Sequence, residues 1–172
     1  ISNTSSFAVS GGGPGSFVSG PLQKNMLAGG SFTFPEGDAS GARYGRLTLS
    51  EVTTAGYYTA WYHNHNPLLD GFDPENKTAP IDVVSDSEYW EITGPAASSG
   101  HVTLRWDANS NIIPADALSR SKLRVVEWNL SWINRGNGGI TGDQYSGTIK
   151  TNPQLALSGT RRFTIGVESL PT

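Results

Sequence analysis

The chain has 172 residues, a formal net charge of −3 and no cysteine. This length suits one domain with its own hydrophobic core, so we expect a single domain over residues 1–172. The absence of cysteine excludes thiol catalysis, zinc–thiolate sites and disulfide scaffolds. Only 16% of the residues are charged, while glycine and aromatic residues are frequent, which is typical of secreted β-proteins.

Basic residues are scattered along the sequence, and Arg161-Arg162 is the only adjacent pair. Domains that bind nucleic acid concentrate positive charge, so we expect no nucleic-acid partner. No run of 18 apolar residues occurs, so we expect no membrane insertion. No signal-peptide pattern is present and the chain begins at Ile1 without methionine, which favours a mature fragment or an excised module.

The first 19 residues differ in composition from the rest, because they are rich in serine and glycine. The run Gly11–Gly15 is typical of a flexible joint. Two interpretations stay open. The segment is either a strand, a loop and a second strand of this domain, or an upstream linker or last rung of a preceding β-repeat.

Strict alternation of apolar and polar residues is the main structural signal farther along the chain. It occurs in seven segments: Ser31–Phe34, Arg46–Leu49, Thr54–His63, Glu88–Ile92, His101–Trp106, Lys122–Asn129 and Arg162–Val167. Such alternation predicts half-buried antiparallel strands.

Clusters of turn-forming residues separate these segments. They are Pro35–Asp38, Asp70–Pro74, Gly94-Pro95, Asp107–Asn109 and Gly136–Gly139. Helix signals are weak, and Pro114–Leu118 is the one candidate for a helical turn. The pattern predicts an all-β protein, an antiparallel β-sandwich of about eight to ten strands with Greek-key, Ig-like or jelly-roll-like connections.

An ordered series of short motifs runs through most of the chain. It comprises Ser16–Lys24, Phe32–Asp38, Tyr44, Leu47–Ser50, Ser87–Ile92, Val102–Asp107, Leu123–Asn129 and Trp132. The series resembles a β-sandwich module of large secreted and cell-surface Bacteroidetes proteins, the adhesin-like cargo of the type IX secretion system. The chain departs from that pattern at Glu36, where valine is usual, and in the insertion-like loop Asn64–Pro80.

The resemblance implies a secreted or cell-surface location and no enzymatic activity. It implies a non-catalytic structural or adhesion module of a surface-anchored bacterial protein, whose partners are the neighbouring domains of a larger chain. Any binding specific to this protein is then expected in the loop Asn64–Pro80, where the resemblance ends.

The aromatic residues favour an alternative, a carbohydrate-binding module of a secreted polysaccharide-degrading enzyme. Exposed aromatic rings can stack on sugars, but large aromatic side chains also fill β-sandwich cores. We expect Trp90, Trp106 and Trp128 in the core. The candidate ligand-binding residues are Tyr58, Trp61, Tyr62 and Trp132, of which Tyr58, Tyr62 and Trp132 are expected at the surface.

Oxygen-bearing side chains gather in and near the loop Asn64–Asn76 and make calcium the one cofactor to consider. The candidate calcium ligands are Asp70, Asp73, Glu75 and Asp82. Their spacing is not that of an EF-hand, and a polar loop with Asx-turns is the favoured interpretation. A second cluster, Asp107, Asn109 and Asn111, lacks the Gly and Glu of a calcium loop and favours a tight hairpin turn.

Histidines and carboxylates offer two further hypotheses. His63 and His65 share one face of a continuing strand, a spacing that can chelate a transition metal, although an exposed pair at a strand end is the favoured interpretation. His101 is distant in sequence. Paired carboxylates hydrolyse glycosides, but we expect Glu88, Glu91 and Glu127 on a solvated strand face. No G-x-S-x-G motif is present, and we expect no enzyme.

Overall fold

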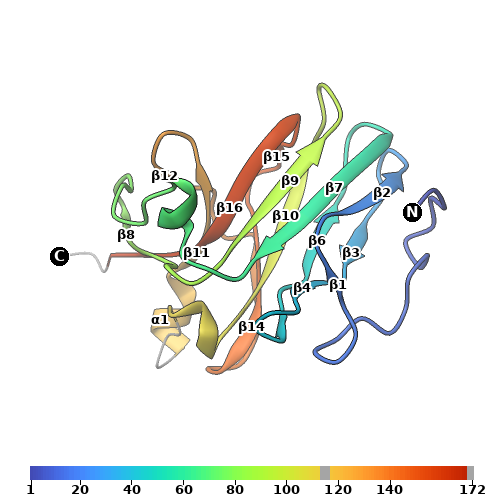
Figure 1. Cartoon of the computed structure of the whole chain (residues 1–172). Helices are drawn as coiled ribbons and strands as arrows, with labels where there is room; N and C mark the ends of the chain where they lie inside the picture. Colours follow the sequence, from blue (N-terminus) through green and yellow to red (C-terminus); the bar gives the residue numbers. More distant parts are fainter. Residues whose placement is uncertain (113–116, 170–172) are drawn as a thin grey trace.

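A computed structural model describes residues 1–112 and 117–169 (Figure 1). The larger sheet has the strand order β12 (Trp132–Asn134), β11 (Leu123–Trp128), β16 (Gly159–Glu168), β9 (Tyr89–Gly94), β7 (Gly56–His63) and β2 (Leu22–Met26), and β8 (Ile81–Val84) pairs with β16. The smaller sheet has the order β13 (Gly139–Gly142), β14 (Ser146–Lys150), β10 (Ser99–Asp107), β6 (Leu47–Ser50) and β3 (Phe32–Phe34), and β15 (Leu155–Ala156) pairs with β10. Both sheets are antiparallel and lie face to face.

A third, short sheet lies at the side of the sandwich. It consists of β1 (Val18–Ser19), β4 (Glu36–Asp38) and β5 (Arg43–Tyr44), and the β1–β4 pair is parallel. The helical segments are short as well: the 3-10 turns η1 (Pro67–Asp70) and η2 (Ala108–Ser110), and the helix α1 (Ala117–Ser121).

The hydrophobic core lies between the two large sheets, because alternate residues of their strands point inward. In β10 the inward residues Val102, Leu104 and Trp106 are fully buried, and in β7 the inward residues are Tyr58, Ala60 and Tyr62. One buried cluster joins residues of both sheets, including Trp90 and Trp106. Burial of this apolar area is the main stabilising term of the fold.

A second hydrophobic cluster covers part of the outer face of the larger sheet. Its buried members are Ile81, Val84, Tyr89, Val126 and Trp132, with Phe72 and Trp128 packed against them. The long loop after β7 supplies Phe72, and the loop therefore folds over the sheet. Trp128, expected in the main core, lies half-buried in this outer cluster because it faces outward from β11 and contacts Trp132 edge-on.

The predicted all-β antiparallel sandwich is confirmed, and each of the seven alternating segments overlaps a strand. Sixteen strands occur among the described residues, more than the expected eight to ten, because several ladders are only two or three residues long. The predicted turn Pro35–Asp38 is wrong in part, since Glu36–Asp38 forms β4 and pairs with β1 and β5. Of the predicted helical turn, residues 114–116 lie outside the described residues, and α1 begins at Ala117.

The first residues of the chain contact the sandwich directly. The Ile1 carbonyl accepts a hydrogen bond from the Asn25 amide at 2.9 Å, and its ammonium group donates to the Gln23 carbonyl at 2.6 Å. Ile1 and Ala8 also pack against the main core. In Figure 1 this segment runs along the side of the sandwich near β2 and β3. These contacts favour the interpretation of the segment as part of the domain.

Candidate functional site

Of the four aromatic residues that are candidates for ligand binding, one is exposed and three are buried. Trp61 is 41% exposed on the outer face of β7. The expected exposure of Tyr58, Tyr62 and Trp132 is wrong, because all three are buried. Tyr58 and Tyr62 have the opposite strand parity to Trp61 and point into the core, while the loop carrying Phe72 covers Trp132.

Trp61 lies between two hollows on the outer face of the larger sheet. The first hollow, of about 530 Å³, is lined by Trp61, His63, His65, Asp70, Phe72, Tyr89, Glu91 and Arg162. The second, of about 270 Å³, is lined by Pro21, Thr59, Ala60, Trp61, Glu91, Thr93, Thr160 and Arg162. Because Trp61, Glu91 and Arg162 line both, the two hollows form one continuous surface, which we call the Trp61 groove.

Stacked rings form one wall of the Trp61 groove. His63 stacks on Tyr89 with ring centroids 4.3 Å apart and planes 2° from parallel, and the Trp61 ring lies 4.5 Å from His63. The Arg162 guanidinium lies 4.5 Å above the Phe72 ring. These contacts hold planar side chains in fixed orientations, since each is packed on a neighbour.

Ion pairs and hydrogen bonds place polar groups along the same groove. Glu91 lies between two partners, His63 Nε2 at 3.1 Å and Arg162 Nη2 at 3.0 Å. Asp70 Oδ2 accepts from the Tyr89 hydroxyl at 2.6 Å and lies 2.5 Å from His65 Nε2. The register Arg162↔Glu91↔Trp61 across β16, β9 and β7 brings three of these residues into one row.

The surroundings fix the charge states of two of these groups. Burial lowers the pKa of His63 although Glu91 acts in the opposite direction, so its imidazole is neutral at neutral pH. The hydroxyl of Tyr89, and after it His65, lowers the pKa of Asp70 below its ordinary value, so Asp70 is ionised. The groove thus presents a carboxylate, a neutral imidazole and an arginine–glutamate pair beside an exposed indole.

The structure does not bring the four candidate calcium ligands together. Asp73 accepts from the Glu75 amide at 2.9 Å as an Asx-turn, and Glu75 pairs with Lys77 at 2.8 Å. Asp82 is exposed on β8. Within residues 1–112 and 117–169, the one group of three potential metal ligands is His63, His65 and Asp70. The expectation of an exposed histidine pair is wrong for His63, whose side chain is only 10% exposed.

The segment Asp107–Asn111 is a capped 3-10 turn and not the hairpin turn that the sequence favoured, because β10 does not pair with β11, the next strand. The Asp107 side chain accepts from the Asn109 amide at 2.8 Å, and Asn111 ends η2 with a left-handed backbone. His101 lies on β10, where its Nδ1 is 3.0 Å from the Thr151 carbonyl. It is not a member of the cluster formed by His63 and His65.

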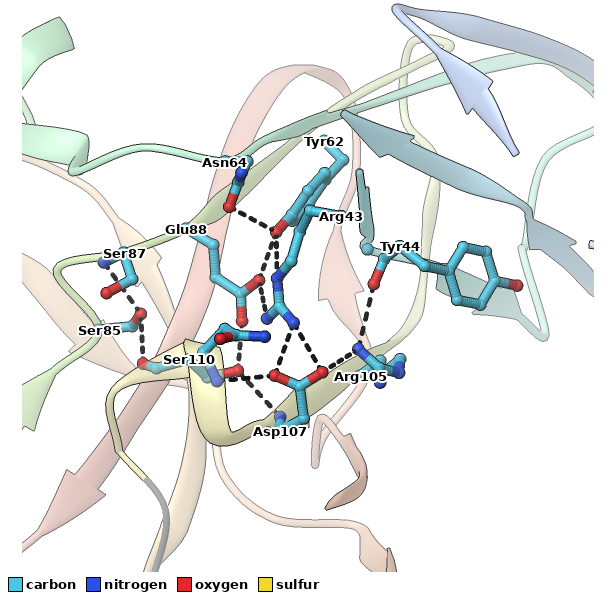
Figure 2. Close-up of polar contacts among 12 residues, drawn as sticks. Arg43, Tyr44, Tyr62, Asn64, Ser85, Ser87, Glu88, Arg105, Asp107 and Ser110 are labelled. Atoms are coloured by element: carbon cyan, nitrogen blue, oxygen red, sulfur yellow. Dashed lines mark hydrogen bonds and ion pairs between the residues drawn. The ribbon is translucent and has the colours of Figure 1, made fainter. Parts of the chain in front are cut away.

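A buried polar network, which the sequence did not reveal, lies at one end of the sandwich (Figure 2). Arg43 Nη1 donates to both oxygens of Asp107 at 2.6 Å, and Nη2 donates to Glu88 at 2.8 Å. The Tyr62 hydroxyl accepts from Arg43 Nε at 3.0 Å and donates to Glu88 at 2.6 Å, and Ser110 donates to the other Glu88 oxygen. No sequence pattern links these residues, because they come together only when the sheets pack.

The three strand carboxylates considered for catalysis have separate arginine partners. Glu88 and Glu127 are 1% and 2% exposed, so their expected position on a solvated face is wrong. Glu88 pairs with Arg43, and Glu127 pairs with Arg135 and Arg161 at 2.7 and 3.1 Å. Glu91 pairs with Arg162 in the Trp61 groove. Their charges are thus compensated locally, which is typical of structural ion pairs.

Comparisons with protein-family models, curated proteins and solved structures found no match for this chain. The resemblance to secreted Bacteroidetes modules therefore stays a prediction. In the part of the chain that the structure describes, no helix has the length and apolar character needed to cross a membrane. The Trp61 groove is the feature on which a function can be argued.

Proposed function

We propose that this chain is a non-catalytic carbohydrate-binding domain that holds a polysaccharide in the Trp61 groove. The observation that carries the proposal is the exposed indole of Trp61 between two polar-rimmed hollows. An exposed indole in a groove favours carbohydrate binding over a purely structural role. It is compatible with adhesion by a secreted or cell-surface protein, because a surface glycan is a natural adhesion target.

The chemistry of the groove fits a sugar. A pyranose ring has an apolar face of C–H groups, which packs on an indole, and a rim of hydroxyls that need hydrogen-bond partners. Arg162, Glu91 and Asp70 offer donors and acceptors beside Trp61. The hydroxyls of Thr93 and Thr160, hydrogen-bonded to each other at 2.9 Å, line the second hollow.

The groove is also preorganised, which reduces the entropy that binding must overcome. The pair Glu91–Arg162 and the stack His63–Tyr89 fix the polar rim before a ligand arrives. Because the groove lies on the face of a sheet and spans two hollows on either side of Trp61, it fits a chain of sugars better than a single ring.

Affinity electrophoresis against soluble polysaccharides, followed by a glycan array, tests this function. Trp61→Ala should weaken binding at least about tenfold, which corresponds to about 1.4 kcal/mol. The matched control is Tyr57→Ala, which removes another exposed aromatic ring from the same face of β7 but outside the groove, and it should bind as the unmodified chain does.

The proposal fails if no polysaccharide binds, or if the two variants lose affinity equally. Tyr62→Ala is unsuitable as a test, because Tyr62 is buried and bonded to Arg43 and Glu88. Loss of binding in that variant would report unfolding. If the chain binds none of the glycans tested, the result favours the structural-module hypothesis, in which the domain stabilises its neighbours.

A further inference from the structure

The cluster His63, His65 and Asp70 brings three metal-ligating side chains together from two elements. His63 and His65 lie on the same side of the chain at the end of β7, and Asp70 closes the turn η1. One potential ligand atom from each residue lies within 4.8 Å of the others. We propose that these three residues bind a divalent transition-metal ion of the zinc class at the end of the Trp61 groove.

The donor set selects this class of ion. Two imidazole nitrogens and one carboxylate oxygen suit zinc and its neighbours, whereas calcium requires six to eight oxygens. A tetrahedral ion with bonds of about 2.0–2.1 Å keeps its ligand atoms about 3.3 Å apart. His65 Nε2 and Asp70 Oδ2, now 2.5 Å apart, must therefore separate by about 1 Å.

That movement is small for these two side chains, because they are 36% and 42% exposed. His63 stays fixed, since its ring stacks on Tyr89. The site then has one rigid ligand on a strand and two adjustable ligands at the surface. Three protein ligands leave at least one coordination position of the ion open to the groove.

The residues around the cluster have the arrangement that orients metal ligands. Glu91 lies 3.1 Å from His63 Nε2, and a carboxylate in this position accepts the proton of one ring nitrogen and leaves the other for a metal. The Tyr89 hydroxyl donates to Asp70 Oδ2 at 2.6 Å and keeps that carboxylate beside the two histidines while it adjusts. Arg162, which lines the same hollow, pairs with Glu91 at 3.0 Å.

Isothermal titration of the full chain with zinc chloride in a non-coordinating buffer tests the site. We expect one ion per chain, with affinity at least about tenfold weaker in His65→Ala and in Asp70→Asn. The matched controls are His101→Ala and Asp73→Asn, which remove the remaining histidine and a neighbouring loop carboxylate, and both should bind zinc as the unmodified chain does. Cobalt should give visible absorption bands that the two site variants lose.

The proposal is overturned if no stoichiometric zinc binding occurs, or if one equivalent binds with unchanged affinity in both site variants. Unchanged melting of His65→Ala without metal separates loss of the site from unfolding. The zinc titration needs no glycan, so this proposal and the proposed carbohydrate binding can fail independently.

Discussion

At the scale of single residues, Glu36 is a carboxyl group buried without a hydrogen-bond partner. It lies in β4 with no exposed surface, and neither carboxylate oxygen has a hydrogen-bond partner. Burial raises its pKa to about 9, although the backbone of Leu22 acts in the opposite direction. The side chain is therefore protonated in the folded protein at neutral pH, while in the unfolded chain it is ionised.

This difference makes the stability of the domain depend on pH. Below about pH 4.5 Glu36 is protonated in both states and costs nothing extra, and between about pH 4.5 and 9 the unfolded state alone is ionised, so stability falls as pH rises. The unfolding free energy of Glu36→Gln should lie close to that of the unmodified chain at pH 5 and above it at pH 8, by on the order of 4–5 kcal/mol, because each pH unit above 4.5 contributes about 1.4 kcal/mol. Thermal melting of both proteins across this pH range measures the effect. If the melting temperatures of the variant and the unmodified chain change with pH in parallel, the prediction is contradicted.

Glu36→Val provides a second comparison at the same position. Valine is usual at this position in the secreted modules that the sequence resembles, and it has no polar group to bury. We expect the same loss of pH dependence as in Glu36→Gln, because both substitutions remove the ionisable group. A decline with pH that persists in both variants would assign it to another carboxyl group.

Single residues of the site were predictable only in part. Alternation along Thr54–His63 correctly placed Trp61 and Tyr62 on opposite faces, but it gave no sign of which face was inside. Aromatic residues occur on both, and the choice depends on the packing of the smaller sheet. The role of Asp70 beside the histidines depends on the fold of η1, which no sequence spacing fixed.

At the scale of elements, the network around Arg43 joins strands from all three sheets. Arg43 belongs to β5, Tyr62 to β7 and Asp107 to β10, and Glu88 immediately precedes β9. Burial alone would raise the pKa of Asp107, but hydrogen bonds from Arg43 and the Asn109 amide hold it below its ordinary value. Gly45, just after β5, permits a close approach, because a side chain there would collide with the Tyr62 ring.

Removing Arg43 should loosen this junction. Arg43→Leu leaves the buried carboxylate of Glu88 without its cation, while Asp107 keeps its pair with Arg105 at 2.6 Å. The unpaired Glu88 should cost about 3–5 kcal/mol of unfolding free energy. The control Arg46→Leu removes an exposed arginine three residues later and should change stability by less than about 0.5 kcal/mol. Urea denaturation measures both, and equal effects would show that the network contributes no more than surface charge.

The long strands were predictable because each carries its own period of two, independent of its partners. The short ladders were not, since β1, β4 and β5 are defined by pairing among distant segments rather than by local alternation. Pro35–Asp38 has the composition of a turn, and its strand conformation follows from β1 and β5 on either side.

At the scale of the whole molecule, one buried cluster spans both large sheets, and the Arg43 network ties their ends. Cooperative unfolding follows when no part of a core can open without exposing the rest. Tryptophan fluorescence reports the five tryptophans, of which Trp90, Trp106 and Trp132 are fully buried, whereas circular dichroism reports the strands. We expect the two urea curves to coincide in one transition, and separated midpoints would indicate independent units.

The Trp61 groove has hollows on both sides of the indole, and this has a statistical consequence for a repetitive ligand. A polymer of identical units can place any internal unit on Trp61, so the number of equivalent registers grows with chain length. The apparent affinity per molecule then rises with polymer length although no contact is added. Exchange between neighbouring registers would let the domain move along a strand of glycan without leaving it.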